Sequence, residues 1–256
     1  MTQNERLYFL LNYLIKESKD YSDIDIPFET SKQKRLLRSL MNIRPPKAAA
    51  AEFLRIQDEY LKHEIQRRGI TDAANLVPLR DRMCVWQGDI TTLKCGAIVN
   101  AANSAMLGCF VPCHGCIDNA IHTYAGVQLR TQCDRLMKQQ GHSEPTGQAK
   151  ITAAYNLPCD CIIHTVGPIV QGALTERDCA LLKSCYIQCL KVAKDNNIKS
   201  IAFCCISMGE FHFPNKAAAE IAINTVTEYL KNSEIERVIF NVFKDSDKEI
   251  YTELLG

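Results

Sequence analysis

The chain has 256 residues, with 30 Lys and Arg against 29 Asp and Glu, so its formal net charge is only +1. A charge this close to neutral excludes a global field that would attract nucleic acid or an anionic membrane, and it favours a discrete small-molecule site. The start of the chain mixes polar and apolar residues, which predicts no signal peptide, and no segment has the roughly 20 apolar residues of a membrane-spanning helix. We therefore expect a cytoplasmic protein.

Cysteine is unusually frequent, with 13 residues. An odd number of cysteines in a chain without export signals favours reduced thiols and metal or redox chemistry over a disulfide framework. Cys84, Cys161, Cys204 and Cys205 lie in apolar runs and are predicted to be small core residues.

Residues 1–72 are predicted to form a helical extension. Leucines and isoleucines at 7, 10, 11, 14 and 15 share one helical face, and a second helix is expected over 32–42, before two prolines. A third helix is predicted from Ala48 to Arg68, ended by Gly69, with a Glu64/Arg68 pair on its exposed face. No catalytic cluster lies here, so the extension is expected to cap the main domain or to recognise a partner.

Residues 73–256 are predicted to form an α/β domain. From about residue 82, short apolar runs alternate with helical patterns, which is typical of a mostly parallel sheet covered by helices. In such sheets ligands bind beyond the carboxyl ends of the strands, so the loops there are the expected site. Strands are predicted over 83–87, 97–100, 161–166, 200–206 and 237–242, and helices over 117–139, 177–194 and 214–231.

Five segments in a fixed order carry a family resemblance. They are Gly88-Asp89-Ile90-Thr91 and the segments 98–104 (IVNAANS), 146–149 (TGQA), 163–168 (IHTVGP) and 206–214 (ISMGEFHFP). In this order and spacing the chain resembles the macrodomain family over roughly residues 80–256. The resemblance implies a three-layer α/β/α macrodomain with a mixed, mostly parallel sheet, and ADP-ribose as its ligand.

The adenine end of the ligand is assigned to three residues. Asp89, just past a strand end, can accept a hydrogen bond from an exocyclic amine, which the resemblance implies is that of adenine; its alternative role is a turn or cap. Ile90 is assigned to the same site. Phe243 follows the last strand and either stacks on adenine, as the resemblance implies, or belongs to the core.

The diphosphate is assigned to Ser207, Met208, Gly209, Glu210 and Phe211. This stretch leads into a predicted helix, where successive backbone N–H groups can close on an anion and the helix dipole favours negative charge. Glu210 departs from the family, which has a small or β-branched residue at that position. Its carboxylate would repel phosphate unless it points outward, so only its backbone amide is expected to contribute.

Asn100 and Asn103 follow an apolar run, and an amide can both donate to and accept from sugar hydroxyls. The resemblance places Asn103 on the distal ribose, so Asn103 is assigned to catalysis together with Asp118 as well as to substrate binding. Asn100 either contacts the ligand directly or ties the loop together.

Cys109, His114 and Cys116 fall within eight residues and are predicted to bind Zn²⁺, which takes thiolate and imidazole ligands in tetrahedral geometry. The segment 108–122 resembles the zinc-containing macrodomain branch, with Gly-Cys-Phe, Pro, His, Cys-Ile-Asp-Asn and Ile-His all present. Three protein ligands leave one coordination position open, as in catalytic zinc sites. Cys113 is a candidate fourth ligand, although side chains 113 and 114 are expected to diverge.

Asp118 comes two residues after the last predicted ligand, where a helix is expected to begin. The resemblance aligns Asp118 with the acidic residue near the scissile bond of hydrolytic macrodomains, so we predict a general base or water-orienting group, with a helix N-cap as the alternative. His122 is one turn further along and is either a satisfied core histidine or a partner of the metal site or of Asp118.

Three other motifs match only partly. Residues 112–116 and 142–144 contain both halves of the zinc deaminase signature, but in reversed order. A thioredoxin-type Cys-x-x-Cys would leave Cys109 and His114 unexplained. Haem attachment needs a His directly after the second Cys, where Ile117 stands.

The sequence thus predicts a zinc-dependent hydrolase that removes ADP-ribose from modified Asp and Glu side chains. A reader that binds ADP-ribose without cleaving it, around a closed four-ligand structural zinc, is the main alternative, and a thiol redox or deaminase protein is a third. The resemblance also implies a modified substrate protein and pairing with a sirtuin-type ADP-ribosyltransferase and a lipoyl-carrier protein.

Overall fold

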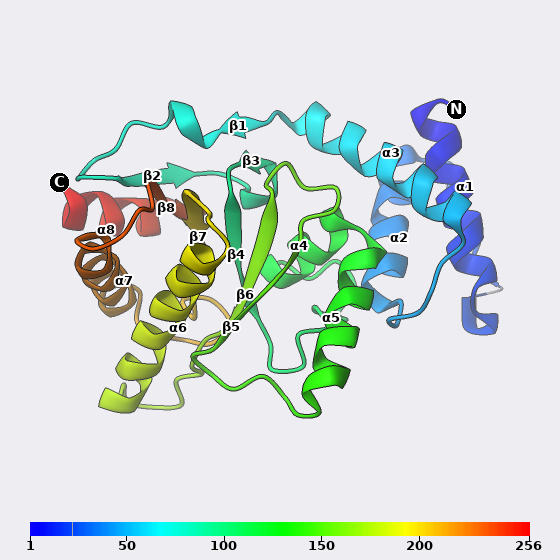
Figure 1. Ribbon diagram of the computed structural model, residues 1–256. Helices are drawn as coiled ribbons and strands as arrows, with labels where there is room; N and C mark the ends of the chain where they lie inside the picture. The colour runs from blue at the N-terminus through cyan, green and yellow to red at the C-terminus, as the bar shows by residue number, and fades with distance from the viewer. Residues whose placement is uncertain (22) are drawn as a thin grey trace.

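The computed structural model describes residues 1–21 and 23–256, and its centre is a six-stranded sheet in the order β2-β8-β7-β4-β6-β5 (Figure 1). All neighbouring pairs run parallel except β5 and β6, which are antiparallel. The predicted mixed, mostly parallel sheet is therefore confirmed. The strands are β2 Met83–Gln87, β4 Ala97–Ala102, β5 Ala149–Ala153, β6 Cys161–Val166, β7 Ser200–Phe203 and β8 Arg237–Val242, and a separate pair joins β1 Thr71–Asp72 to β3 Leu93–Lys94.

The strands with continuous apolar runs are the best predicted ones. β2, β6 and β8 have the predicted bounds, and β6 and β8 lie inside the sheet, where nearly every residue is buried. β7 ends at Phe203 instead of residue 206, since the chain turns away from the sheet there. The edge strand β5 was not predicted, because its half-exposed Ala-Lys-Ile-Thr-Ala lacks an apolar run.

Helices cover both faces of the sheet and give three layers. Figure 1 shows α6, α7 and α8 on one side of the strands and α4 and α5 on the other. α8, which was not predicted, is short and buries only Asp247, Tyr251 and Leu255. The bounds are α4 Ile117–Ala125, α5 Val127–Gln140, α6 Glu176–Asp195, α7 Asn215–Leu230 and α8 Asp245–Leu255.

The single helix predicted over 117–139 is in fact two helices, separated at Gly126. This residue has φ 101°, which no helix contains, and a Cβ there would lie 2.6 Å from the amide nitrogen of Gln57. The side-chain Oε1 of Gln57 accepts a hydrogen bond from the Val127 N–H, the first amide of α5. A tertiary contact with α3 therefore ends one helix and begins the next.

The N-terminal extension forms α1 Gln3–Lys16, α2 Thr30–Ile43 and α3 Ala51–Arg68, with a single turn of 3₁₀ helix at Lys19–Tyr21. These helices share an apolar cluster that includes Leu10, Leu11 and Phe53 and reaches Val127 of α5. Figure 1 shows them beside α4 and α5, at the end of the molecule away from α8. The boundary at residue 72 stays a prediction.

The predicted exposed Glu64/Arg68 pair is wrong. Glu64 is buried, and its carboxylate pairs with Lys34 of α2 at 2.8 Å and with Arg67 at 3.3 Å. Arg68 instead pairs with Asp89 of the main domain. Helical spacing cannot reveal that Lys34 of α2 reaches this face of α3.

All thirteen cysteines are free thiols. Cys84 and Cys204 are buried, as predicted, and burial raises the pKa of Cys204 to about 12. Cys161 and Cys205 are partly buried, and burial likewise raises the pKa of Cys161 to about 11. These thiols stay protonated and unreactive at neutral pH. In residues 1–21 and 23–256, no helix is both long and apolar enough to cross a membrane.

The apolar cluster of the extension generates a stability prediction. Leu10 is fully buried, so Leu10→Ala should lower the free energy of unfolding by about 2–5 kcal/mol through lost burial and a residual cavity. Tyr8→Ala on the same helix is the control, because Tyr8 is 56% exposed. Chemical denaturation measures both variants, and equal unfolding midpoints would contradict the prediction.

Candidate active site and metal centre

A hydrogen-bond network crosses β4 and β6 beneath the candidate site. The parallel register sets Asn100 beside His164, and both are fully buried. The Asn100 amide nitrogen donates to Asp118 Oδ1 at 2.8 Å and to His164 Nδ1 at 3.1 Å. Since His164 Nδ1 accepts, its Nε2 carries the proton and donates to Thr152 Oγ1 at 2.8 Å. The network therefore holds a neutral imidazole in one tautomer.

Asp118 is a buried carboxylate held by two amides. In addition to Asn100, the Asn103 amide nitrogen donates to its Oδ2 at 3.2 Å. Burial raises the pKa of Asp118 to about 6, and the hydrogen bond from Asn100 opposes that rise. The alternative N-cap role is wrong, because Cys116 caps α4 by accepting from the Asn119 N–H.

His122 lies one turn along α4 from Asp118, with Nε2 3.5 Å from Asp118 Oδ1. Both ring nitrogens are buried without a hydrogen-bond partner, and burial lowers the pKa of His122 well below its usual value. Gly108, at φ 79°, packs so closely that a Cβ there would lie 2.7 Å from the ring. His122 is therefore a neutral group beside Asp118 and not a satisfied core histidine.

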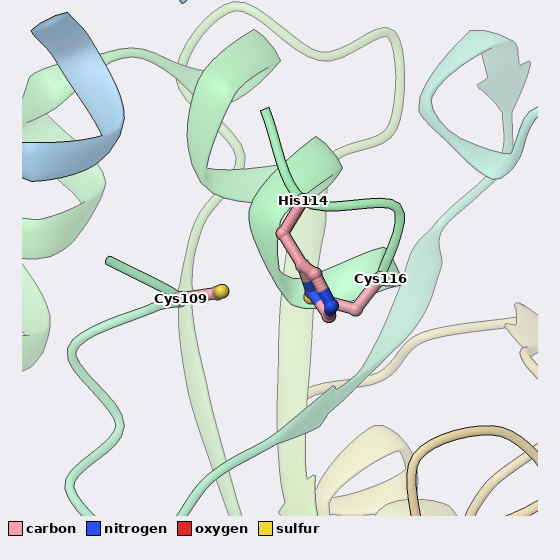
Figure 2. Close-up of side chains that lie close together, drawn as sticks. All are labelled: Cys109, His114 and Cys116. Atoms are coloured by element: carbon pink, nitrogen blue, oxygen red, sulfur yellow. The ribbon is translucent and has the colours of Figure 1, made fainter. Parts of the chain in front are cut away.

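The predicted ligands Cys109, His114 and Cys116 lie together. One ligand atom from each lies within 4.8 Å of the others, and Figure 2 shows the Cys109 side chain pointing toward the other two. His114 Nδ1 is buried without a partner, which suits a metal ligand. Burial and the neighbouring Cys109 raise the pKa of Cys116, and a divalent cation would oppose that rise. Two sulfurs and an imidazole nitrogen fit Zn²⁺.

Cys113 does not belong to this group. It has a left-handed backbone, with φ 54°, and its thiol points toward α2. Its Sγ lies 3.2 Å from Ser39 Oγ and donates to the Arg35 carbonyl at 3.5 Å. The group therefore offers three protein ligands.

A second group of possible ligands, His122, Cys133 and His164, lies in the core, also with atoms within 4.8 Å. Both nitrogens of His164 already have hydrogen-bond partners, and burial raises the pKa of Cys133 to about 12. This group is therefore less suited to a cation than the partly exposed group at 109–116.

The two halves of the deaminase signature do not meet. His142 is exposed, and the buried Glu144 forms an ion pair with Lys150 at 3.0 Å. Neither His142 nor Glu144 belongs to a group of possible metal ligands in the part of the chain that the structure describes. The arrangement disfavours a zinc deaminase.

The loop after β7 has the features of an anion site. Ser207 has φ 64°, and the Phe213 N–H closes the loop onto the Ser207 carbonyl. The N–H groups of residues 209–211 donate to no acceptor within residues 1–21 and 23–256, and a Cβ at Gly209 would meet nothing within 4 Å. Open backbone donors of this kind can receive a phosphate. α7 begins at Asn215, one residue after the predicted start, so the loop leads into the helix as predicted.

Two assigned residues face inward. Ile90 and Met208 are buried in the main core, so they could meet a ligand only through their backbone. Glu210 is 68% exposed at its side chain, and its Oε1 lies 3.7 Å from His114 Nε2. Its carboxylate therefore points toward the loop 109–116, which carries the predicted metal ligands.

Asp89 serves as a cap and is also partly exposed. Its Oδ1 accepts from the Thr91 N–H at 3.0 Å and from Thr91 Oγ1 at 2.6 Å, while Oδ2 pairs with Arg68 at 2.5 Å. The side chain remains 40% exposed, and the contact with an amine stays a prediction. Phe243 is 77% exposed, so it is not a core residue and presents a ring for stacking.

Two arginines of the extension were missed by sequence reasoning. Arg68 lies over the ring of Tyr124 at 3.7 Å while it pairs with Asp89. Arg38 donates to Asn119. A charged residue on an amphipathic helix looks like part of a solvated face, so the sequence holds no local signal for either contact.

Comparison with known proteins identifies the class. A family model described as Macro domain matches residues 99–222. A protein named Protein-ADP-ribose hydrolase, from Treponema medium, is 56% identical over 261 residues, covering 100% of both chains. The chain belongs to the macrodomain family.

Two further relatives cover different shares of this chain. A solved Oceanobacillus iheyensis macrodomain mutant with ADPR has a TM-score of 0.64 and 34% identity, covering 70% of this chain and 95% of that chain. A Fusarium oxysporum protein named Probable bifunctional ADP-ribose hydrolase/ADP-ribosyltransferase is 41% identical, covering 89% of this chain and 42% of its own length. The likeness to the solved macrodomain agrees with the α/β architecture described above.

The buried His164 generates a pH prediction. Burial lowers its pKa from 6.5 to about 3, so between these values the unfolded chain binds more protons than the folded chain. Relative to His164→Gln, the wild type should lose up to about 1.4 kcal/mol of unfolding free energy for each pH unit below about 6.5. Asp118 has the opposite linkage, but it is present in both proteins. Parallel stability curves from pH 7 to 4 would contradict the prediction.

Proposed function

We propose that this protein is a zinc-dependent hydrolase that removes ADP-ribose from modified Asp and Glu side chains. The observation that carries the proposal is the three-ligand group Cys109, His114 and Cys116, followed two residues later by Asp118, whose buried carboxylate is held by the amides of Asn100 and Asn103. The name of the Treponema medium relative, Protein-ADP-ribose hydrolase, supports the hydrolase activity. The Oceanobacillus iheyensis macrodomain, solved with ADPR, supports ADP-ribose as the ligand.

The nucleotide would be held along the carboxyl edge of the sheet. The open N–H groups of 209–211 suit the diphosphate, and the exposed ring of Phe243 and carboxylate of Asp89 suit adenine. The Asn100 Oδ1 atom is buried without a partner, so it can accept a hydrogen bond from a ribose hydroxyl. Binding energy from these remote groups would position the distal ribose for reaction.

Asp118 is proposed to take the proton of the attacking oxygen. Two amides fix its carboxylate, and its raised pKa, about 6, makes it a base suited to near-neutral pH. When bound by Cys109, His114 and Cys116, Zn²⁺ would supply Lewis-acid polarisation of oxygen. The reaction adds one water across the ester, which leaves ADP-ribose and a free carboxylate.

The three-ligand arrangement supports a hydrolase over a reader. A reader with a structural zinc would need a fourth ligand, and the predicted candidate, Cys113, points toward α2. Glu210, whose Oε1 lies 3.7 Å from His114 Nε2, does not belong to the group of possible ligands among the described residues. Three ligands leave a coordination position for substrate or water.

The cellular partners are proposed from the resemblance. The Fusarium oxysporum relative joins an ADP-ribose hydrolase to an ADP-ribosyltransferase in its printed name, which supports functional pairing with a transferase. We propose a sirtuin-type transferase, a lipoyl-carrier protein as the modified substrate, and a cytoplasmic setting, for which the thirteen free thiols are support.

The metal proposal is tested on a protein ADP-ribosylated at carboxylates. Wild type should release ADP-ribose, whereas a chelated sample and Cys116→Ala should not, because the ligand group is then emptied or broken. Cys113→Ser is the matched control and should keep its zinc and its activity. Equal release from wild type, chelated sample and Cys116→Ala would end the proposal, and faster release from an arginine-linked substrate would overturn the Asp/Glu specificity.

A second prediction concerns Asp118 as the proposed general base. Asp118→Ala should bind ADP-ribose as wild type does in calorimetry but lose about 10²–10⁴-fold in rate, the usual contribution of a positioned proton acceptor. Zinc content, measured in parallel, separates loss of the base from loss of the metal. Undiminished turnover would remove Asp118 from the catalytic residues.

A further inference from the structure

We propose that helix α2 of the N-terminal extension is part of the metal site, with Arg38 as a positioning residue that holds the ligand loop. The inference rests on the proposed zinc dependence and extends it to a helix outside the matched family region. That region begins at residue 99, 61 residues after Arg38.

Arg38 connects the loop that carries the proposed metal ligands to the first turn of α4. Its Nη2 donates to the backbone carbonyl of the ligand His114 at 3.0 Å. Its Nε and Nη2 donate to Asn119 Oδ1, at 3.2 Å and 2.8 Å. A planar guanidinium can reach both acceptors in one geometry, which the single ammonium of a lysine cannot reproduce.

Asn119 connects Arg38 to a second proposed metal ligand, Cys116. It is fully buried, and its backbone N–H donates to Cys116 Sγ at 3.4 Å. Its side-chain nitrogen donates to the Val111 carbonyl at 3.0 Å, in the same loop. Arg38 therefore acts on His114 directly and on Cys116 through Asn119.

One stripe of α2 faces the loop. Arg38, Ser39 and Asn42 lie at helical spacing on the same side of the helix. Asn42 Oδ1 accepts from the Cys113 N–H at 2.9 Å, and its amide nitrogen donates to Thr123 Oγ1 at 2.9 Å. Asn42 is only 1% exposed, so this polar stripe is buried against the loop instead of being solvated.

α2 is itself anchored to the main domain. Arg130 of α5 donates to the carbonyls of Met41 and Asn42 at the end of α2, at 3.2 Å and 2.7 Å. These contacts make α2 a fixed support and not a loosely attached helix.

The loop needs such support because residues 103–116 contain no helix or strand. Ligands on an irregular segment must be ordered when the cation binds, and that entropy cost weakens affinity unless other contacts order them beforehand. Residues that orient metal ligands typically contribute 10–100-fold to metal affinity.

The test is the affinity of the full chain for Zn²⁺, measured by competition with a chromophoric chelator. Arg38→Ala should raise the Kd about 10-fold or more, and Arg38→Lys should have an intermediate effect. Arg35→Ala is the matched control and should not change the Kd. Arg35 is exposed and lies three residues away on the same helix, and its side chain forms no hydrogen bond or ion pair with residues 1–21 and 23–256.

Two further measurements exclude a general loss of structure. Binding of ADP-ribose to the metal-free variants should match wild type, and the visible spectrum of Co²⁺-loaded Arg38→Ala should differ from wild type if the ligand geometry has changed. If Arg38→Ala fails to fold, Arg38→Lys decides the question. If the wild type does not bind Zn²⁺, the proposed function is wrong. If the wild type and both Arg38 variants bind Zn²⁺ with equal affinity, only the proposed role of α2 is wrong.

Discussion

The site depends on the burial of one carboxylate between two amides. Asp118 is removed from water, and the hydrogen bonds from Asn100 and Asn103, together with the positive charge of Arg130, offset the cost of that burial. Asn100 has two amide hydrogens, and the second fixes the tautomer of His164. The sheet therefore sets the orientation and the basicity of the group to which we assign proton transfer, before any ligand arrives.

The extension and the main domain meet at the part of the molecule that carries the chemistry. Arg68 of α3 pairs with Asp89, one of the residues proposed to bind adenine. Arg38 of α2 donates to the loop that carries the proposed metal ligands. The two ends of the proposed ligand thus each lie near a contact from the extension. A helical segment that looks like a simple cap in the sequence is closely integrated with the site.

The sequence predicted the features that depend on local pattern. The bounds of β6 and β8 followed from apolar runs, and the proximity of Cys109, His114 and Cys116, the proposed metal ligands, followed from their spacing. The features that were missed arise from contacts between distant segments. Gln57 contacts Val127 from 70 residues away, and Arg38 contacts Asn119 from 81 residues away, so neither the break at Gly126 nor the role of α2 has a local signal.

The register of β4 against β6 also limits how such a chain can change in length. A one-residue insertion within β4, before Asn100, would turn this amide to the opposite face of the sheet and leave both Asp118 and His164 without its hydrogens. The turn at residues 171–173, between β6 and α6, is exposed, and a Cβ at Gly172 would meet nothing within 4 Å, so extra residues there would extend into solvent. Evolutionary drift in length should therefore accumulate at that turn and stay out of the strand.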